Sequence, residues 1–183
     1  MSIKLVSFFI VTAGLVYISR ASLRAPRSHG FYRFFAWECI LALFLLNVDE
    51  WFRDPFSPLH LVSWFLLIFS GYLVIDAVYR LRRFGMQDQE RQDTGLLGFE
   101  KTTALVTTGV YRYIRHPLYS SLLFLAWGIF FKDVTWPTAF LAVAATSFLF
   151  VTARWDESES LRFFGPLYQE YMQRTKRFIP FIF

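Results

Sequence analysis

The sequence predicts an all-α integral membrane protein with five transmembrane helices and a cytoplasmic C-terminal amphipathic helix. Two observations predict this class. First, 55% of the 183 residues are apolar and only 18% are charged, whereas soluble domains are about 45–50% apolar and about 25% charged. Second, the apolar residues gather in five stretches, for which a bilayer is the natural solvent. The same composition excludes intrinsic disorder and low-complexity sequence.

The five candidate spans are residues 5–18, 34–48, 59–78, 118–131 and 136–153. A helix needs roughly 20 residues to cross a bilayer, with about 17 as the lower limit. The third and fifth stretches reach this length alone. The others reach it with flanking residues, as 2–19, 31–51 and 113–131. We expect one domain over residues 1–183, with three N-terminal spans in residues 1–79.

The charges between the stretches predict the orientation of the chain. The first loop carries four arginines and no acid, the segment 80–115 carries seven basic residues, and the tail from Arg154 carries five. The second and fourth loops are acidic or neutral. Because cytoplasmic loops are enriched in Lys and Arg, we expect these three basic segments in the cytoplasm and the N-terminus outside.

Residues 1–21 allow a second interpretation as a signal peptide, because Lys4 precedes an apolar run that ends in Ser19-Arg20-Ala21. Four arginines directly after the run oppose export, so we favour a retained first helix. At the other end of the chain, residues 156–176 show apolar residues at three- and four-residue steps, which predicts a helix. Gly165-Pro166 should interrupt it, and residues 178–183 should return to the membrane interface.

The densest polar motif is residues 107–120, where a basic loop enters the fourth stretch. Pro117 suits the first turn of a helix, and His116 is then disfavoured in the helical conformation. Such a helix start exposes N–H groups and the positive end of the dipole, so Arg, His and Tyr around it favour an anionic or polar ligand. The alternative is an interfacial anchor without a binding site.

A second polar motif, Asp156-Glu157, follows the fifth stretch on the same side. These acids suit Arg112, Arg115 or a cationic ligand, or else they form a solvated helix start. Residues 105–119, the acid pair and residues 164–171 together resemble the isoprenylcysteine carboxyl methyltransferase family, which is related to integral-membrane phospholipid methyltransferases. The resemblance covers roughly the last ninety residues of the chain, judged from where these motifs begin and end.

The resemblance implies S-adenosylmethionine as the methyl donor, held by residues 80–183 in a cytoplasmic pocket that the C-terminal segment caps. It also implies a lateral opening for a lipophilic acceptor. The implied cofactor contacts are Thr103, Ala104, Leu105, Val106, Tyr111, His116, Pro117, Leu118, Tyr119, Asp156 and Glu157. Thr152 stands where prenylcysteine enzymes carry an arginine, which disfavours a prenylcysteine carboxylate as acceptor.

The candidate catalytic residues are Arg115, Glu157 and Glu38. Glu38 and Asp76 both lie within apolar stretches, where an acid is a functional candidate by default. The alternative for both is snorkelling or pairing with a nearby arginine. A carboxylate of the second motif would hold the amine or the ribose of the donor, and the tyrosines would bracket adenine or the sulfonium.

We therefore expect transfer of a methyl group from S-adenosylmethionine to a lipophilic acceptor, by carboxylate O-methylation of the isoprenylcysteine type. The alternatives are a phospholipid amine, a small thiol, or a non-enzymatic membrane scaffold. The three histidines are too scattered for a metal site, and no basic stripe suggests nucleic acid as a partner. Cys39, the single cysteine, excludes an internal disulfide.

Overall fold

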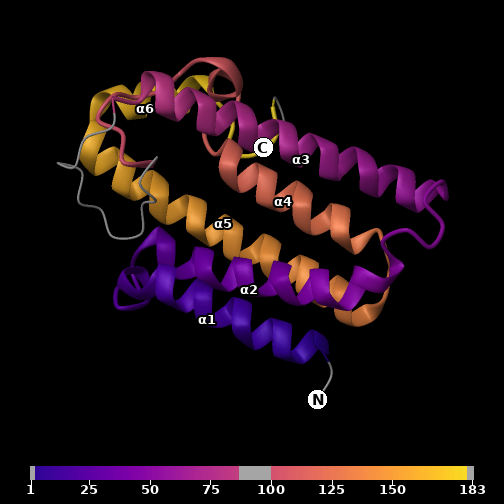
Figure 1. Ribbon diagram of the computed structural model, residues 1–183. Helices are drawn as coiled ribbons and strands as arrows, with labels where there is room; N and C mark the ends of the chain where they lie inside the picture. Colours follow the sequence, from indigo (N-terminus) through magenta and orange to yellow (C-terminus); the bar gives the residue numbers. More distant parts are fainter. Residues whose placement is uncertain (1–2, 87–99, 181–183) are drawn as a thin grey trace.

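The computed structural model describes residues 3–86 and 100–180 (Figure 1). Their six α-helices are α1 (Ile3–Leu23), α2 (His29–Asn47), α3 (Pro58–Phe84), α4 (Pro117–Phe130), α5 (Trp136–Phe164) and α6 (Pro166–Arg174). Two 3₁₀ helices accompany them, η1 (Val48–Glu50) and η3 (Gly109–Arg112). The predicted all-α class is confirmed.

Within the described residues, four helical segments are long and apolar enough to cross a bilayer: Ile3–Leu23, His29–Glu50, Pro58–Phe84 and Trp136–Phe164. The fourth expected span, residues 118–131, forms α4, which has only 14 residues. A helix of that length is about 21 Å long, whereas the hydrocarbon core is about 30 Å thick. The five-span prediction is therefore not confirmed, because residues 113–116 form a corner instead of lengthening the helix.

The helices lie side by side in two packed pairs (Figure 1). α3 packs against α4, α5 packs against α2, α4 joins the two pairs, and α1 lies on the outer side of α2. The N-termini of α2 and α4 meet the C-termini of α3 and α5 at one end of the molecule, next to α6. We call this the α6 end. The described parts of the three basic segments, the α1–α2 loop, residues 100–115 and the tail, all lie there.

Small polar residues set the register between α3 and α4. The hydroxyl of Ser63 donates to the carbonyl of Gly128 over 2.6 Å, and that of Ser70 donates to the carbonyl of Ser121 over 2.7 Å. A Cβ atom on Gly128 would lie 2.9 Å from the side chain of Leu67, so the two backbones approach closely because this residue is glycine. Small residues and interhelical hydrogen bonds of this kind hold helices together in lipid, where apolar burial provides little driving force.

The outer faces of α1 and α3 are apolar and exposed. Ile10, Phe65, Ile68 and Ile75 keep 66–71% of their surface accessible. A soluble protein rarely exposes such a surface, and acyl chains would cover it in a bilayer. The chain is an integral membrane protein with several apolar helices.

The helix predicted for residues 156–176 is present with one difference, which is that its first part continues α5. α5 continues without a break through Asp156-Glu157 to Phe164, so its last two turns extend beyond the length of helix that a bilayer covers. Gly165, with φ of 57°, ends α5, and Pro166 begins the short α6, which confirms the predicted interruption. Residues 175–178 form an extended strap after α6. The last three residues of the expected interfacial segment 178–183 lie outside the described residues.

Candidate active site

A tight corner precedes α4 and is anchored on α3. One carboxylate oxygen of Asp76 accepts the N–H of Val110 over 3.0 Å, and the other accepts Nε of Arg80 over 3.1 Å. Gly109 has φ of 62°, and a Cβ there would lie 2.2 Å from Nε of Arg80, so only glycine fits. Of the two interpretations of Asp76, pairing with a nearby arginine is the one that the structure supports.

The strap lies along this corner. The N–H of Arg115 donates to the carbonyl of Lys176 over 2.8 Å, and the N–H of His116 donates to the carbonyl of Arg177 over 3.2 Å. Pro117 begins α4, and His116 before it lies outside the helical region, with φ of −121° and ψ of 60°. The C-terminal strap thus covers the corner.

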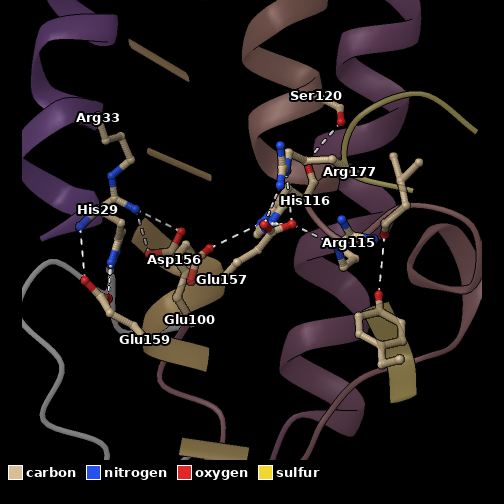
Figure 2. Close-up of polar contacts among 12 residues, drawn as sticks. His29, Arg33, Glu100, Arg115, His116, Ser120, Asp156, Glu157, Glu159 and Arg177 are labelled. Carbon is tan, nitrogen blue, oxygen red and sulfur yellow. Dashed lines mark hydrogen bonds and ion pairs between the residues drawn. The ribbon is translucent and has the colours of Figure 1, made fainter. Parts of the chain in front are cut away.

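Buried ion pairs join the corner, the strap and α5 (Figure 2). Nε of Arg115 lies 2.9 Å from Oε1 of Glu157, and Nη2 of Arg177 lies 2.7 Å from Oε2 of the same carboxylate. His116 Nδ1 lies 3.3 Å from Oδ2 of Asp156. The acid pair of α5 and the corner, about forty residues apart in sequence, therefore meet at one site.

His116 lies between the two acids of this site and is 5% exposed. Burial lowers the pKa of its imidazole, but hydrogen bonds and charge attraction from Asp156 and Glu157 outweigh burial, so the pKa is raised above its usual value. Nε2 lies 3.4 Å from Oε1 of Glu157 and has no hydrogen-bond partner. The site thus favours an imidazolium held between the carboxylates of Asp156 and Glu157.

A second buried ionic group joins the N-terminus of α2 to the same region (Figure 2). Nη1 of Arg33 donates to both carboxylate oxygens of Glu100, over 3.1 and 2.8 Å. Nδ1 of His29 lies 2.5 Å from Oε2 of Glu159 on α5. From the sequence, Arg33 belonged to the basic first loop and was a possible partner for the acids within the apolar stretches. Its place beside the apolar run 34–48 was the signal that could have pointed to a buried role.

A pocket with a cavity volume of about 90 Å³, open to solvent, lies between these groups. Nine of its lining residues were predicted from the sequence, and these are Leu105, Val106, Tyr111, Arg115, His116, Pro117, Leu118, Tyr119 and Asp156. Sequence reasoning missed a further set, which is Leu81, Glu100, Thr102, Ser160, Phe164, Tyr168 and Tyr171. Most of this set lies on three different helices, α3, α5 and α6. These residues come together only because the helices pack against one another.

Tyrosines supply much of the pocket wall. Burial raises the pKa of Tyr111, and burial likewise raises those of Tyr168 and Tyr171, so all three phenols stay protonated. The hydroxyl of Tyr171 donates to the carbonyl of Tyr111 over 2.7 Å and ties α6 to the corner. These residues supply flat rings and neutral hydroxyls instead of anions.

Four predicted site residues do not line the pocket. The backbone N–H groups of Thr103 and Ala104 donate hydrogen bonds to the carbonyl of Gly85 at the end of α3. Glu157 lies behind the wall, where Arg115 and Arg177 occupy both of its oxygens. Glu38 lies midway along α2.

Glu38 faces α1, away from the pocket. The hydroxyl of Thr12 donates to its Oε2 over 2.7 Å, and its Oε1 is buried without a hydrogen-bond partner. This contact ties α1 to α2 and offers no path to the pocket residues. A catalytic role for Glu38 has no support in this geometry.

Residues 59–170 match the sequence model of a family described as phospholipid methyltransferase. The matched region runs from α3 into α6 and includes Arg115, His116 and Glu157. The chain belongs to this family. The match includes more than half of the chain and all of the pocket lining except Tyr171. Members of the family use S-adenosylmethionine as methyl donor.

Similar proteins of this family act on different acceptors according to their names. Protein-S-isoprenylcysteine O-methyltransferase B of Arabidopsis thaliana is 36% identical over 144 residues, which is 75% of this chain and 72% of the plant protein. Methanethiol S-methyltransferase of Pseudomonas sp. (strain GM41(2012)) is 24% identical over 135 residues, which is 73% of this chain and 49% of the relative. The chain thus spans about half the length of that relative. No solved structure matches the chain.

Proposed function

We propose that this protein transfers a methyl group from S-adenosylmethionine to a lipophilic acceptor at a membrane surface. One observation carries the proposal: the corner before α4 and the acids of α5 enclose one pocket, although they are far apart in sequence. Family membership supports the donor, because members use S-adenosylmethionine. A scaffold without a ligand would have no need of buried, partly unpartnered polar groups around a pocket.

The pocket residues fit the polar groups of this donor. The N-terminus of α4 lines the pocket, and its first N–H groups have no acceptor within the helix. Together with the positive charge of the His116 imidazolium, these donors suit the carboxylate of the methionine part. Glu100 and Asp156, which also line the pocket, suit the ammonium group or the ribose hydroxyls.

When bound, S-adenosylmethionine supplies an electrophilic methyl group on a sulfonium cation. The work of the protein is alignment, since displacement at a methyl group requires acceptor, carbon and sulfur in line. The rings of Tyr111 and Tyr119 would flank the cationic and flat parts of the ligand. Tyr168 and Tyr171 of α6 line one side of the pocket.

We assign Arg115 and Glu157 a positioning role. The guanidinium of Arg115 is bonded to Glu157 and to the carbonyls of Met172 and Thr175. Its Nε and Nη1 donors therefore bind α5, α6 and the strap. The two oxygens of Glu157 accept hydrogen bonds from Arg115 and Arg177. Both residues hold the strap on the corner, which is the positioning role that we assign to them.

The acceptor that we propose first is a carboxylate of the isoprenylcysteine type, as in the plant relative. A small thiol is the second candidate, and one observation favours it. Thr152 is fully buried and its hydroxyl donates to the carbonyl of Phe148, so the position that is arginine in prenylcysteine enzymes offers no cation here. Neither a carboxylate nor a thiolate needs a general base, whereas an ammonium acceptor must first lose a proton.

The first test is donor binding by the full chain in phosphatidylcholine nanodiscs, measured by calorimetry. We expect saturable binding of S-adenosylmethionine, and we expect His116→Ala to weaken it about tenfold or more because a charge-assisted hydrogen bond is lost. The matched control is His60→Ala. His60 lies at the opposite end, where its ring hydrogen-bonds to Ser57 and to the backbone carbonyl of Glu50. Absence of binding to folded protein would contradict the proposal, as would equal binding by the two variants.

The second test identifies the acceptor class. Membranes that contain the protein are incubated with donor carrying a radiolabelled methyl group, and label is counted in the lipid, protein and volatile fractions. Label in base-labile esters of the protein or lipid fraction supports the carboxylate. Volatile label that depends on an added thiol supports the second candidate. Bound donor without label in any fraction would contradict a methyltransferase activity.

A further inference from the structure

The segment 110–116 has two faces, and only one of them belongs to the pocket. Tyr111, Arg115 and His116 face the pocket, whereas Arg112 and Ile114 line a second hollow on the other side. We call this second hollow the outer groove. Ile114 is 2% exposed, and no described residue lines both cavities. The outer groove is therefore a separate feature and not a route to the pocket.

The outer groove is an apolar channel that extends toward the middle of the bilayer. Phe69 and Tyr72 of α3, Phe124 of α4 and Phe178 of the strap line it. Phe69 and Phe124 make an edge-to-face contact with ring centroids 5.0 Å apart. Phe69 lies two helical turns before Asp76, which holds the corner, so the groove reaches about 10 Å along α3. This length and lining suit part of an acyl chain.

The end of the groove at the corner is cationic. Arg112 is exposed and lines both the outer groove and a neighbouring polar hollow that contains Thr107 and Arg174. Arg174 pairs with Glu170. Among residues 3–86 and 100–180 no carboxylate pairs with Arg112, whose nearest recorded partner is the ring of Tyr113 at 5.9 Å. A guanidinium with free donors above an apolar channel matches a phosphate that carries an acyl chain.

We propose that the outer groove binds an anionic phospholipid of the surrounding bilayer. Its phosphate lies at Arg112 and Thr107, and one acyl chain lies against Phe69 and Phe124. The occupant is a bilayer lipid because the groove opens beside the exposed apolar face of α3, where Tyr72 is 56% exposed and Ile75 is 71% exposed. Basic residues at this end attract anionic headgroups before any specific contact forms.

The lipid has a consequence for the pocket, and this part of the inference rests on the proposed function. One acyl chain would contact α3, the corner, α4 and the strap, and the first three of these elements also line the donor pocket from the other side. Ordering them in advance reduces the cost of ordering when the donor binds. Anionic lipid is therefore an activator that tightens donor binding.

The experiment compares nanodiscs of phosphatidylcholine alone with nanodiscs that contain about one fifth phosphatidylglycerol. Lipid retained by the protein is counted by native mass spectrometry, and donor affinity is measured by calorimetry. We expect retained phosphatidylglycerol and about fivefold tighter donor binding in the mixed discs. Arg112→Gln should remove both effects without changing donor affinity in phosphatidylcholine alone.

The matched control is Arg82→Gln, which removes an exposed charge from the same end of α3 but not from the outer groove. It should behave as the wild type. Equal retention of phosphatidylglycerol by wild type and Arg112→Gln would overturn the lipid site. Retained lipid with no donor binding in any disc would leave the lipid site standing and overturn the proposed function instead.

Discussion

His116 shows how strongly one residue depends on its surroundings. An isolated histidine loses its charge near neutral pH, but here two carboxylates raise the pKa of the imidazole in spite of burial. The folded chain therefore holds this proton more tightly than the unfolded chain does. The resulting stabilisation is complete below the usual histidine pKa and is lost as the pH rises through the raised value.

The first prediction concerns this titration. Affinity for S-adenosylmethionine should be highest when His116 is protonated and should fall as the pH rises through the raised pKa, since a neutral ring attracts the donor carboxylate less. Calorimetry over about pH 6 to 9 measures the profile. The His116→Asn variant should bind S-adenosylmethionine more weakly than the wild type at low pH. Its affinity should not fall further as the pH rises. An unchanged profile in His116→Asn would show that another group titrates.

Some residues of the site could be predicted from the sequence, and others could not. The corner residues and Asp156 were predictable because Pro117, the flanking basic residues and the acid pair are local signals. The role of Asp76 was not, because it depends on whether α3 brings its carboxylate to the N–H of Val110. Glu38 was a candidate catalytic residue on sequence alone, and its contact with Thr12 likewise depends on the packing of α1.

At the scale of elements, α2 matters for the site although the matched family region begins at residue 59. Arg33 on α2 pairs with Glu100 in the pocket wall, and both side chains are at least nine-tenths buried. The pair holds the segment that begins at residue 100 against the bundle. The N-terminal helices are therefore part of the proposed donor site.

The second prediction tests this pair. Arg33→Gln leaves Glu100 buried without its cation and should destabilise the protein by about 3 kcal/mol, with weaker donor binding as well. Arg53→Gln is the matched control, because its pair with Glu50 is exposed at the opposite end and should contribute little to stability. Thermal unfolding in nanodiscs measures both. Equal losses in the two variants would mean that the Arg33 pair has no special role.

At the scale of the whole molecule, the charge pattern gains a structural meaning. The arginines after α1, the corner and the strap come together at the α6 end, together with the pocket, whereas the η1 end carries Asp49 and Glu50. Cytoplasmic surfaces are enriched in basic residues, so we propose that the pocket faces the cytoplasm.

The third prediction tests this orientation by cysteine labelling in a Cys39→Ser background. Phe56→Cys, at an 85% exposed position of the η1 end, should react with a membrane-impermeant maleimide applied from outside the cell. Arg27→Cys, at an exposed position in the α1–α2 loop of the α6 end, should react only after permeabilisation. The reverse pattern would place the pocket outside.

The sequence by itself determined the membrane-spanning character, the basic end and the corner motif, because hydrophobic length, charge bias and a proline at a helix start are local properties that lipid and helix geometry read directly. Only the tertiary structure decided that α4 stops after 14 residues, that Glu157 is held by Arg115 and Arg177, and that Arg33 reaches Glu100. Such contacts depend on how rigid helices pack and rotate against one another, which no local pattern encodes.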